Sequence, residues 1–186
     1  MKEYKFCILK NEDPESHYEW ETACKKHNAK YDIVELKSNK WLEGVLKENY
    51  DCYLLKPPGN RSEYKTLYDE RIYILSKVLN KFVYPSYEEL IIHENKRMLS
   101  YFVEAKNIPH IRTDVFYNKK ECIDFAKSTE YPIVAKTSIG AGGDGVAFLN
   151  SYDESLKYIN EAFSRGISRK TGPGLRQGTY LKRAAK

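Results

Sequence analysis

The first eighty residues alternate short apolar runs with segments of helical spacing, and this alternation most constrains the fold. Three apolar runs are predicted to be strands, at residues 5–9, 31–36 and 51–55. Apolar side chains at helical spacing predict helices that begin near Asp13, span 41–46 and span 62–80. Strands that alternate with helices build a parallel sheet, because parallel neighbours need a crossover of helical length. We therefore predict a small parallel α/β domain over residues 1–84.

A second region follows a break at Pro85 and Ser86. A helix is predicted over 93–106, with a buried stripe of Met98, Leu99, Phe102 and Val103. Residues 111–117 are predicted to be extended, and Asn118 can cap the helix that follows. Strands are predicted over 132–137 and 145–149, before a helix whose start, Ser151 and Glu154, has capping-box spacing. These elements predict an α+β subdomain over 85–165, followed by a basic flexible tail over 166–186.

The segment Ser138–Val146 lies between the last two predicted strands and is rich in glycine. It holds four glycines in six positions: Gly140, Gly142, Gly143 and Gly145. Glycine accepts positive φ and lets the backbone approach a ligand, so consecutive N–H groups can point at one anion. The segment therefore predicts a phosphate-binding loop. A long hairpin turn is the alternative, although a simple hairpin needs fewer glycines.

The flanking residues separate the known kinds of phosphate loop. A Rossmann fingerprint needs a helix directly after the glycines, and here a β-like run follows. A Walker loop ends in Gly-Lys-Ser/Thr, whereas Val146 follows Gly145. A protein kinase also has a strand, a glycine loop and a strand, but its lysine lies on the strand after the next, whereas Lys136 lies before the loop. Lys136 follows Ile133–Ala135, which predict a largely buried strand where an unpaired lysine would be costly. A phosphate or a nucleotide base would satisfy it.

Four segments in this order resemble the ATP-grasp family. They are Asn95-Lys-Arg-Met-Leu99, Asn107-Ile-Pro-His-Ile-Arg-Thr113, Tyr131-Pro-Ile-Val-Ala-Lys136 and Ser138-Ile-Gly-Ala-Gly-Gly-Asp-Gly-Val146. The resemblance covers roughly residues 85–165, and residues 1–84 are more loosely similar to the α/β domain that precedes the grasp in many members. Thr137 stands where many members carry proline. The resemblance implies an α/β fold in which a pre-ATP-grasp domain precedes the first, incomplete part of an ATP-grasp fold.

The resemblance also implies the roles of the candidate site residues. Lys96 corresponds to a lysine that contacts ATP phosphate, and Lys136 to one that reaches the α-phosphate and the adenine edge. By itself, Lys96 would be taken as a solvated lysine in a first helical turn. The loop that closes over the β- and γ-phosphates is matched by Ser138, Gly140, Gly142, Gly143, Gly145 and Val146. ATP is thus the expected ligand, and no catalytic residue is assigned.

The resemblance further implies that ATP-dependent activation of a carboxylate as an acylphosphate precedes attack by an amine or another nucleophile. In the family, Mg²⁺ is held by acidic residues and an asparagine in a second lobe after the loop. No Asp or Glu follows Glu161, so no metal ligands are assigned here. We expect the chain to be part of a longer ligase and inactive alone. A stand-alone half, completed by a homodimer or by a partner chain that supplies the second lobe, is the alternative.

Charge and composition bear on two other functions. Of the 31 Lys and Arg residues, seven lie in 165–186, which leaves 24 against 26 Asp and Glu over residues 1–164. Because residues 1–164 have no excess positive charge, a nucleic-acid binder is disfavoured. Binding of nucleic acid through the basic tail stays an alternative. A non-catalytic nucleotide-binding or regulatory module is the other alternative. Scattered cysteines and the lack of a long apolar run predict a cytoplasmic protein without a membrane span or a metal site.

Overall fold

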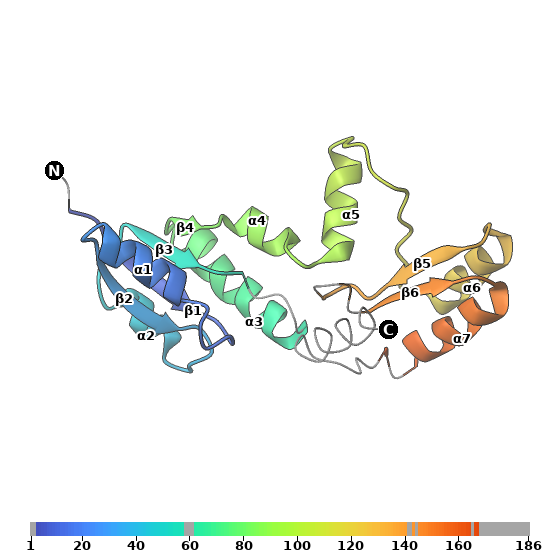
Figure 1. The fold of residues 1–186 in the computed structure, drawn as a ribbon, viewed down its shortest axis with the longest axis horizontal. Helices are drawn as coiled ribbons and strands as arrows, with labels where there is room; N and C mark the ends of the chain where they lie inside the picture. The colour runs from blue at the N-terminus through green and yellow to red at the C-terminus, as the bar shows by residue number, and fades with distance from the viewer. Residues whose placement is uncertain (1–2, 58–61, 141–142, 144, 165, 168–186) are drawn as a thin grey trace, which may run out of the picture. The chain divides into compact units, whose positions relative to one another are not determined.

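The chain divides into two compact units, Met1–Phe102 and Val103–Lys186 (Figure 1). The computed structural model describes residues 3–57, 62–140, 143, 145–164 and 166–167. The division comes later in the chain than the domain boundary predicted after residue 84. Leu90 lies in the core of the first unit, and Lys65 donates a hydrogen bond to its carbonyl oxygen, so residues beyond 84 pack with this unit. The domain limits at 84 and 165 stay predictions.

A parallel sheet forms the centre of the first unit. Its strands are β1 (Lys5–Lys10), β2 (Lys30–Glu35), β3 (Cys52–Leu55) and β4 (Val83–Tyr84). They lie in the order β2-β1-β3-β4, and every neighbouring pair is parallel. The predicted parallel α/β fold is therefore confirmed. β4 is not predicted from the sequence, because a strand of two residues is too short to show an alternating pattern.

The helices of the first unit follow the predicted order, with additions. They are α1 (Tyr18–Lys26), α2 (Trp41–Leu46), α3 (Ser62–Tyr73), α4 (Tyr87–Ile92) and α5 (Lys96–Ala105), the last of which continues beyond Phe102 into the second unit. The helix predicted over 62–80 is α-helical only to Tyr73 and continues as a π-helix, η1 (Ile74–Val78). None of the helices in the described part of the chain is long and apolar enough to cross a membrane.

Each face of this sheet has its own apolar core. Alternate residues of a strand point to opposite faces. On one face they pack with α2 and α3 in a core that includes Leu9, Val45 and Ile72. On the other face Ile8 and Leu54 pack with Cys24 of α1. Helices thus cover both faces, as a parallel sheet requires because its strands are apolar on both sides.

A capping box begins α4, a helix that the sequence analysis missed. The Ser86 hydroxyl accepts a hydrogen bond from the Glu89 backbone N–H, and the Glu89 carboxylate accepts one from the Ser86 backbone N–H. The spacing Ser-x-x-Glu in the sequence is the signal that could have found it. These bonds matter for the site below, because α4 leads directly to the start of α5.

Replacing Glu89 by glutamine should destabilise the first unit at neutral pH. The backbone N–H and the hydroxyl of Ser86 hold the pKa of Glu89 below its ordinary value of 4.5. A lowered carboxyl pKa stabilises the fold above pH 4.5, and this contribution is lost as the pH falls through the lowered pKa. The stability difference between wild type and Glu89→Gln should therefore shrink below pH 4.5. Urea unfolding followed by tryptophan fluorescence measures it, since both tryptophans, Trp20 and Trp41, lie in the first unit.

The matched control for this prediction is Glu70→Gln, an exposed glutamate on α3 of the same unit. Its substitution should leave the urea midpoint and its pH dependence close to wild type. A Glu89→Gln protein with an unchanged midpoint at neutral pH would contradict the prediction.

Among its described residues, the second unit combines two helices with a two-stranded antiparallel sheet. Its elements are α6 (Lys119–Ser128), β5 (Ile133–Lys136), β6 (Val146–Leu149) and α7 (Tyr152–Ala162). The predicted caps are confirmed: the Asn118 side chain accepts from two backbone N–H groups of α6, and the Ser151 hydroxyl from the Glu154 N–H. Residues 111–117 form no strand. α6 packs with α7, and α7 with β6.

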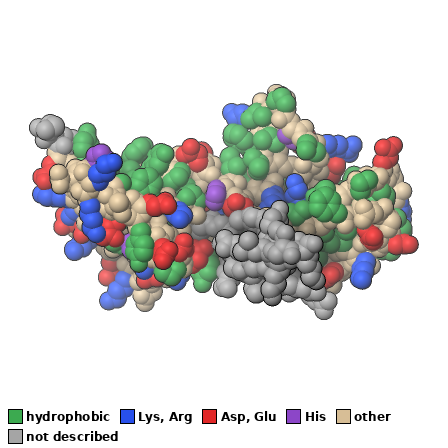
Figure 2. All heavy atoms as spheres, in the orientation of Figure 1, with side chains coloured by type: hydrophobic (Ala, Val, Ile, Leu, Met, Phe, Trp, Pro, Cys, Tyr) green, Lys and Arg blue, Asp and Glu red, His purple; other side chains and the backbone are tan. Residues whose placement is uncertain are grey.

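The predicted buried stripe of α5 is wrong for two of its members. Leu99 is 47% exposed and Phe102 is 37% exposed, and the buried residue of this helix is Ser100. Met98 and Val103 are half-buried. Hydrophobic side chains gather over α5 on the surface in Figure 2. The periodicity identified the helix correctly, but it could not show that this apolar side lacks a full covering layer within the described residues.

Candidate functional site

The β5–β6 hairpin has one covered face and one open face. In the register of the two strands, Val134 pairs with Phe148 and Lys136 pairs with Val146. Val134 is 48% exposed and Phe148 is 72% exposed, whereas Leu149 is buried. Because side chains alternate along a strand, Lys136 lies on the same face as Val134. A lysine and two apolar side chains thus share the open face.

This arrangement corrects one step of the sequence reasoning. The run Ile133–Ala135 predicts a largely buried strand, with a costly unpaired lysine at its end. The structure instead has Ile133 and Ala135 half-buried and Val134 and Lys136 exposed. Two strands packed against helices on one side cannot bury both faces. Lys136 therefore reaches solvent without a desolvation penalty, and it is accessible to a ligand.

Thr137 and Gly145 close the base of the glycine-rich segment. The Thr137 backbone N–H donates to the Gly145 carbonyl oxygen at 2.8 Å, directly beyond the Lys136–Val146 pair. Gly145 has φ of +71°, and a Cβ built there would lie 1.9 Å from Thr137 Oγ1. Only glycine fits this position, for both backbone and steric reasons. A proline at 137, which many ATP-grasp members carry, would remove this N–H donor.

The loop above this base is described in part. Gly140 (φ 150°) and Gly143 (φ 80°) also have positive φ, which residues with a side chain rarely adopt. Gly140 is buried, Gly143 is exposed and Ser138 is half-buried. Gly142 lies outside the described residues. Three glycines of the predicted phosphate loop thus have conformations that require glycine.

Lys96 is the first residue of α5, in the first unit. Asn95 caps this helix, because its side-chain oxygen accepts from the Met98 N–H at 3.1 Å. Lys96 is half-buried. A positive charge in a first turn opposes the helix dipole, and an anion near the same turn would relieve this. Lys96 and the hairpin belong to different units, so each is described by itself.

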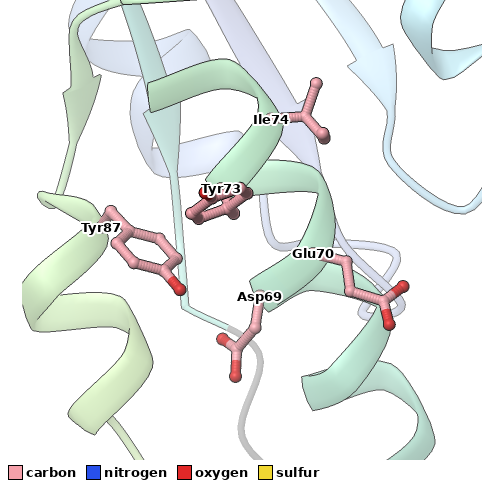
Figure 3. A pocket seen from close by; sticks show the side chains of 5 residues that line it. All are labelled: Asp69, Glu70, Tyr73, Ile74 and Tyr87. Atoms are coloured by element: carbon pink, nitrogen blue, oxygen red, sulfur yellow. The ribbon is translucent and has the colours of Figure 1, made fainter. Parts of the chain in front are cut away.

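The first unit also has a shallow depression of about 480 Å³ between α3, η1 and α4 (Figure 3). It is lined by Asp69, Glu70, Tyr73, Ile74 and Tyr87. The rings of Tyr73 and Tyr87 meet edge to face with centroids 5.7 Å apart. Burial raises the pKa of Asp69 against the opposing effect of Lys65. The Asp69 carboxylate accepts a hydrogen bond from Lys65, so this depression presents no unpaired charge from Asp69 to a ligand.

Neither the histidines nor the cysteines assemble a metal site in the part of the chain that the structure describes. Within those residues, no three His, Cys, Asp or Glu side chains lie together as a metal-ligand group. The four cysteines are free thiols. Burial raises the pKa of Cys7 to about 12 and that of Cys52 to about 11, which disfavours the thiolate form that metals and electrophiles need. The described residues therefore show no group of side chains to which a metal ion can be assigned.

Comparison with known proteins agrees with this geometry. Residues 96–172 match the family described as carbamoyl-phosphate synthase L chain, ATP binding domain. The chain is 30% identical over 92 residues to the alpha-aminoadipate–LysW ligase LysX of Saccharolobus solfataricus, covering 48% of this chain and 34% of the ligase. It is 29% identical over 75 residues to the C-terminal section of the carbamoyl phosphate synthase large chain of Methanocaldococcus jannaschii, covering 40% of this chain and 12% of that protein.

The fold has solved counterparts as well. The RimK domain ATP-grasp protein of Sphaerobacter thermophilus superposes with a TM-score of 0.61 at 13% identity, covering 89% of this chain and 61% of that chain. The matched segment, residues 96–172, and the fold together support a place for this partial chain in the ATP-grasp superfamily. It spans about a third of the length of the LysX ligase and about an eighth of the large-chain section.

Proposed function

We propose that this chain binds ATP and contributes its nucleotide site to an ATP-dependent carboxylate ligase. The observation that carries the proposal is the open face of the β5–β6 hairpin. There Lys136 shares a face with the exposed Val134 and Phe148, and its strand runs directly into the glycine loop. A fixed cation beside an apolar surface suits a nucleotide, which has phosphates at one end and a flat base at the other.

The residues have separate roles in this proposal. The Lys136 ammonium binds the α-phosphate and the edge of the base, and Val134 gives the base an apolar surface. Backbone N–H groups of the loop bind the outer phosphates, with Ser138, Gly140, Gly142, Gly143, Gly145 and Val146 as its members. A glycine-rich loop can close over a ligand and exclude water. Lys96, at the start of α5, adds a second positive charge for phosphate.

The chemistry of the whole enzyme goes beyond this chain. Bound ATP would supply a phosphoryl group that activates a carboxylate as an acylphosphate for attack by an amine or another nucleophile. The LysX relative is by name an alpha-aminoadipate–LysW ligase, which supports a ligase of this type. Because the described residues contain no group of three such ligands, we assign Mg²⁺ no ligands here and expect them in a second lobe or a partner chain. The four free cysteines support a cytoplasmic location.

Calorimetric titration of the full chain with ATP, with and without Mg²⁺, tests the proposed function. We expect saturable binding, and weaker binding of inorganic triphosphate, which has the phosphates but lacks the base. Absence of saturable heat for ATP under both conditions would contradict the proposal. Binding of triphosphate as tight as that of ATP would contradict the role of the apolar face.

Lys96→Ala should weaken ATP binding by about tenfold, since a hydrogen bond to a charged group contributes about 1.5–3 kcal/mol. The control is Lys106→Ala, an exposed lysine just beyond the other end of α5. That control should bind ATP like wild type. Equal affinities of wild type and Lys96→Ala for ATP would contradict the role of Lys96 in ATP binding. They would not bear on the proposed role of the hairpin.

A further inference from the structure

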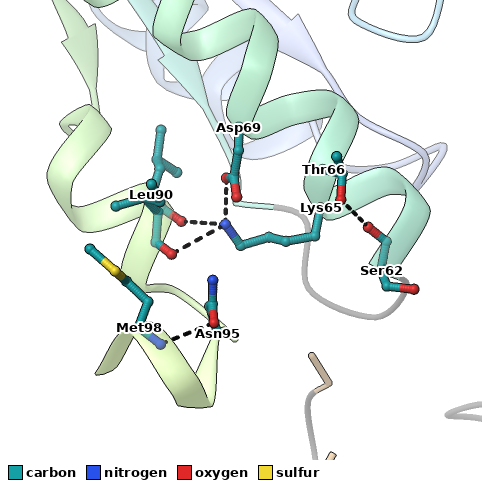
Figure 4. Close-up of polar contacts among 8 residues, drawn as sticks. Ser62, Lys65, Thr66, Asp69, Leu90, Asn95 and Met98 are labelled. Carbon is teal, nitrogen blue, oxygen red and sulfur yellow. Dashed lines mark hydrogen bonds and ion pairs between the residues drawn. The ribbon is translucent and has the colours of Figure 1, made fainter. Parts of the chain in front are cut away.

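Lys65 is a buried lysine that the proposed nucleotide site does not use directly. Only 2% of the residue is exposed. Its ammonium donates to the Asp69 carboxylate, to the Leu90 carbonyl oxygen at 2.9 Å and to the Ile91 carbonyl oxygen at 3.5 Å (Figure 4). An ammonium has three N–H donors, so each of them has an acceptor. A buried charge with this complete set of partners is held in one place.

The two carbonyl groups belong to the last turn of α4. A helix leaves its last four carbonyl oxygens without partners inside the helix, and that end carries partial negative charge. Here the His93 N–H donates to the Glu89 oxygen and the Asn95 N–H to the Ile92 oxygen. The two carbonyl oxygens between these, those of Leu90 and Ile91, accept hydrogen bonds from Lys65. α4 has only six residues, so contacts outside the helix must hold it in place.

The residues that follow α4 also form the start of α5. Asn95, whose N–H donates to the Ile92 oxygen at 3.1 Å, accepts from the Met98 N–H with its side chain and from the Leu99 N–H with its carbonyl oxygen. Glu94, between the two helices, has φ of +51°, a conformation that is unfavourable for a residue with a side chain. Lys65 is therefore connected to the first turn of α5 by its bonds to the Leu90 and Ile91 oxygens, the peptide link from Ile91 to Ile92, and the bonds of Asn95.

We infer that Lys65 is a positioning residue for Lys96: its ammonium, paired with Asp69, fixes the end of α4 and thereby the place where α5 presents Lys96. The inference rests on the proposed function for the role of Lys96 in ATP binding. A buried ion pair adds little stability compared with apolar side chains of similar size, but it can fix a geometry. We call the Lys65–Asp69 pair, with its bonds to the end of α4, the clamp. The double variant Lys65→Met/Asp69→Leu removes the clamp and fills the same buried volume with apolar side chains.

Amide hydrogen exchange of this double variant is the first part of the test. We expect the N–H groups of Met98 and Leu99 to exchange at least tenfold faster than in wild type. Tryptophan fluorescence, which reports the first unit, should show that the variant is folded. If that protein does not fold, Lys65→Gln is the second variant, because its amide has two donors and should give a smaller increase at the same N–H groups. Unchanged exchange in a folded variant would overturn the inference, whether or not ATP binds.

A double-mutant cycle with ATP titration is the second part. Removing the clamp should weaken ATP binding about tenfold in the wild-type background. It should cause no further loss in the Lys96→Ala background, because the positioned group is already gone. In the Lys136→Ala background, removing the clamp should lower ATP affinity by the same factor as in wild type, in addition to the loss caused by Lys136→Ala. Equal losses in all three backgrounds would mean a general structural effect and would overturn the inference. Failure of wild type to bind ATP would instead contradict the proposed function, and the exchange result would still decide the role of Lys65.

Discussion

Lys136→Ala should lower the affinity for ATP by about 10- to 100-fold, the largest loss expected from any single side chain of the site. A charge-assisted hydrogen bond contributes about 1.5–3 kcal/mol, and Lys136 would make one to a phosphate beside an apolar surface. Because Lys136 is exposed, its removal should leave the fold unchanged. Calorimetric titration of the full chain gives the affinity, and circular dichroism checks the fold.

The matched control for Lys136→Ala is Lys127→Ala in the same unit. Lys127 is exposed and pairs with Asp124 on α6, so its loss should leave ATP affinity unchanged. If both variants lose affinity equally, general charge attraction explains the binding and the assignment of Lys136 is wrong. If neither loses affinity while wild type binds ATP, the nucleotide lies elsewhere.

Gly145→Ala should disrupt the second unit more than any other substitution of a loop residue. The alanine must adopt φ near +71°, and its Cβ would lie 1.9 Å from Thr137 Oγ1 and 2.8 Å from Thr137 Cγ2. The conformation alone costs about 1–2 kcal/mol, and the steric overlap adds to it. Tryptophan fluorescence cannot report the effect, because both tryptophans lie in the first unit. Faster amide exchange over β5 and β6 is the expected observation.

Two further variants separate the causes of this effect. Gly166 has φ of +80° but no atom within 4 Å of a built Cβ, so Gly166→Ala should show the backbone cost alone. Thr137→Ala removes the two closest atoms, so Gly145→Ala/Thr137→Ala should recover part of the lost protection. Equal effects of Gly145→Ala and Gly166→Ala would show that the Thr137 contact contributes nothing.

The sequence predicted the elements whose pattern is local and periodic. The strands β1 to β3, the short helix α2 and the caps at Asn118 and Ser151 follow from side-chain periodicity and capping chemistry. The ATP-grasp resemblance followed from four motifs in order, and the family match and the fold confirm it. The roles of Lys96, Lys136 and the loop residues stay predictions until nucleotide binding is measured.

The rest depends on tertiary packing, which periodicity does not show. Val134 has the same type of side chain as a core residue, but it lies on an open face because only one layer of helices covers the hairpin. Lys65 looks in the sequence like any solvated lysine on a helix, and its burial follows from the position of α4, which brings two carbonyl oxygens to it. The error over Leu99 and Phe102 has the same origin, since a stripe becomes buried only where another layer covers it.

The two-stranded hairpin has a consequence for how nucleotide affinity can vary between related sequences. A pair of strands is marginally stable without a supporting layer, and here α7 packs with β6 and α6 packs with α7. The buried residues of these elements include Leu149 of β6, Ala126 of α6 and Ile159 of α7. Changes in the volume of these three residues would tilt or loosen the strand that carries Lys136 without touching a nucleotide. We therefore expect nucleotide affinity to change through mutations of these buried residues while every residue of the proposed ATP site stays the same.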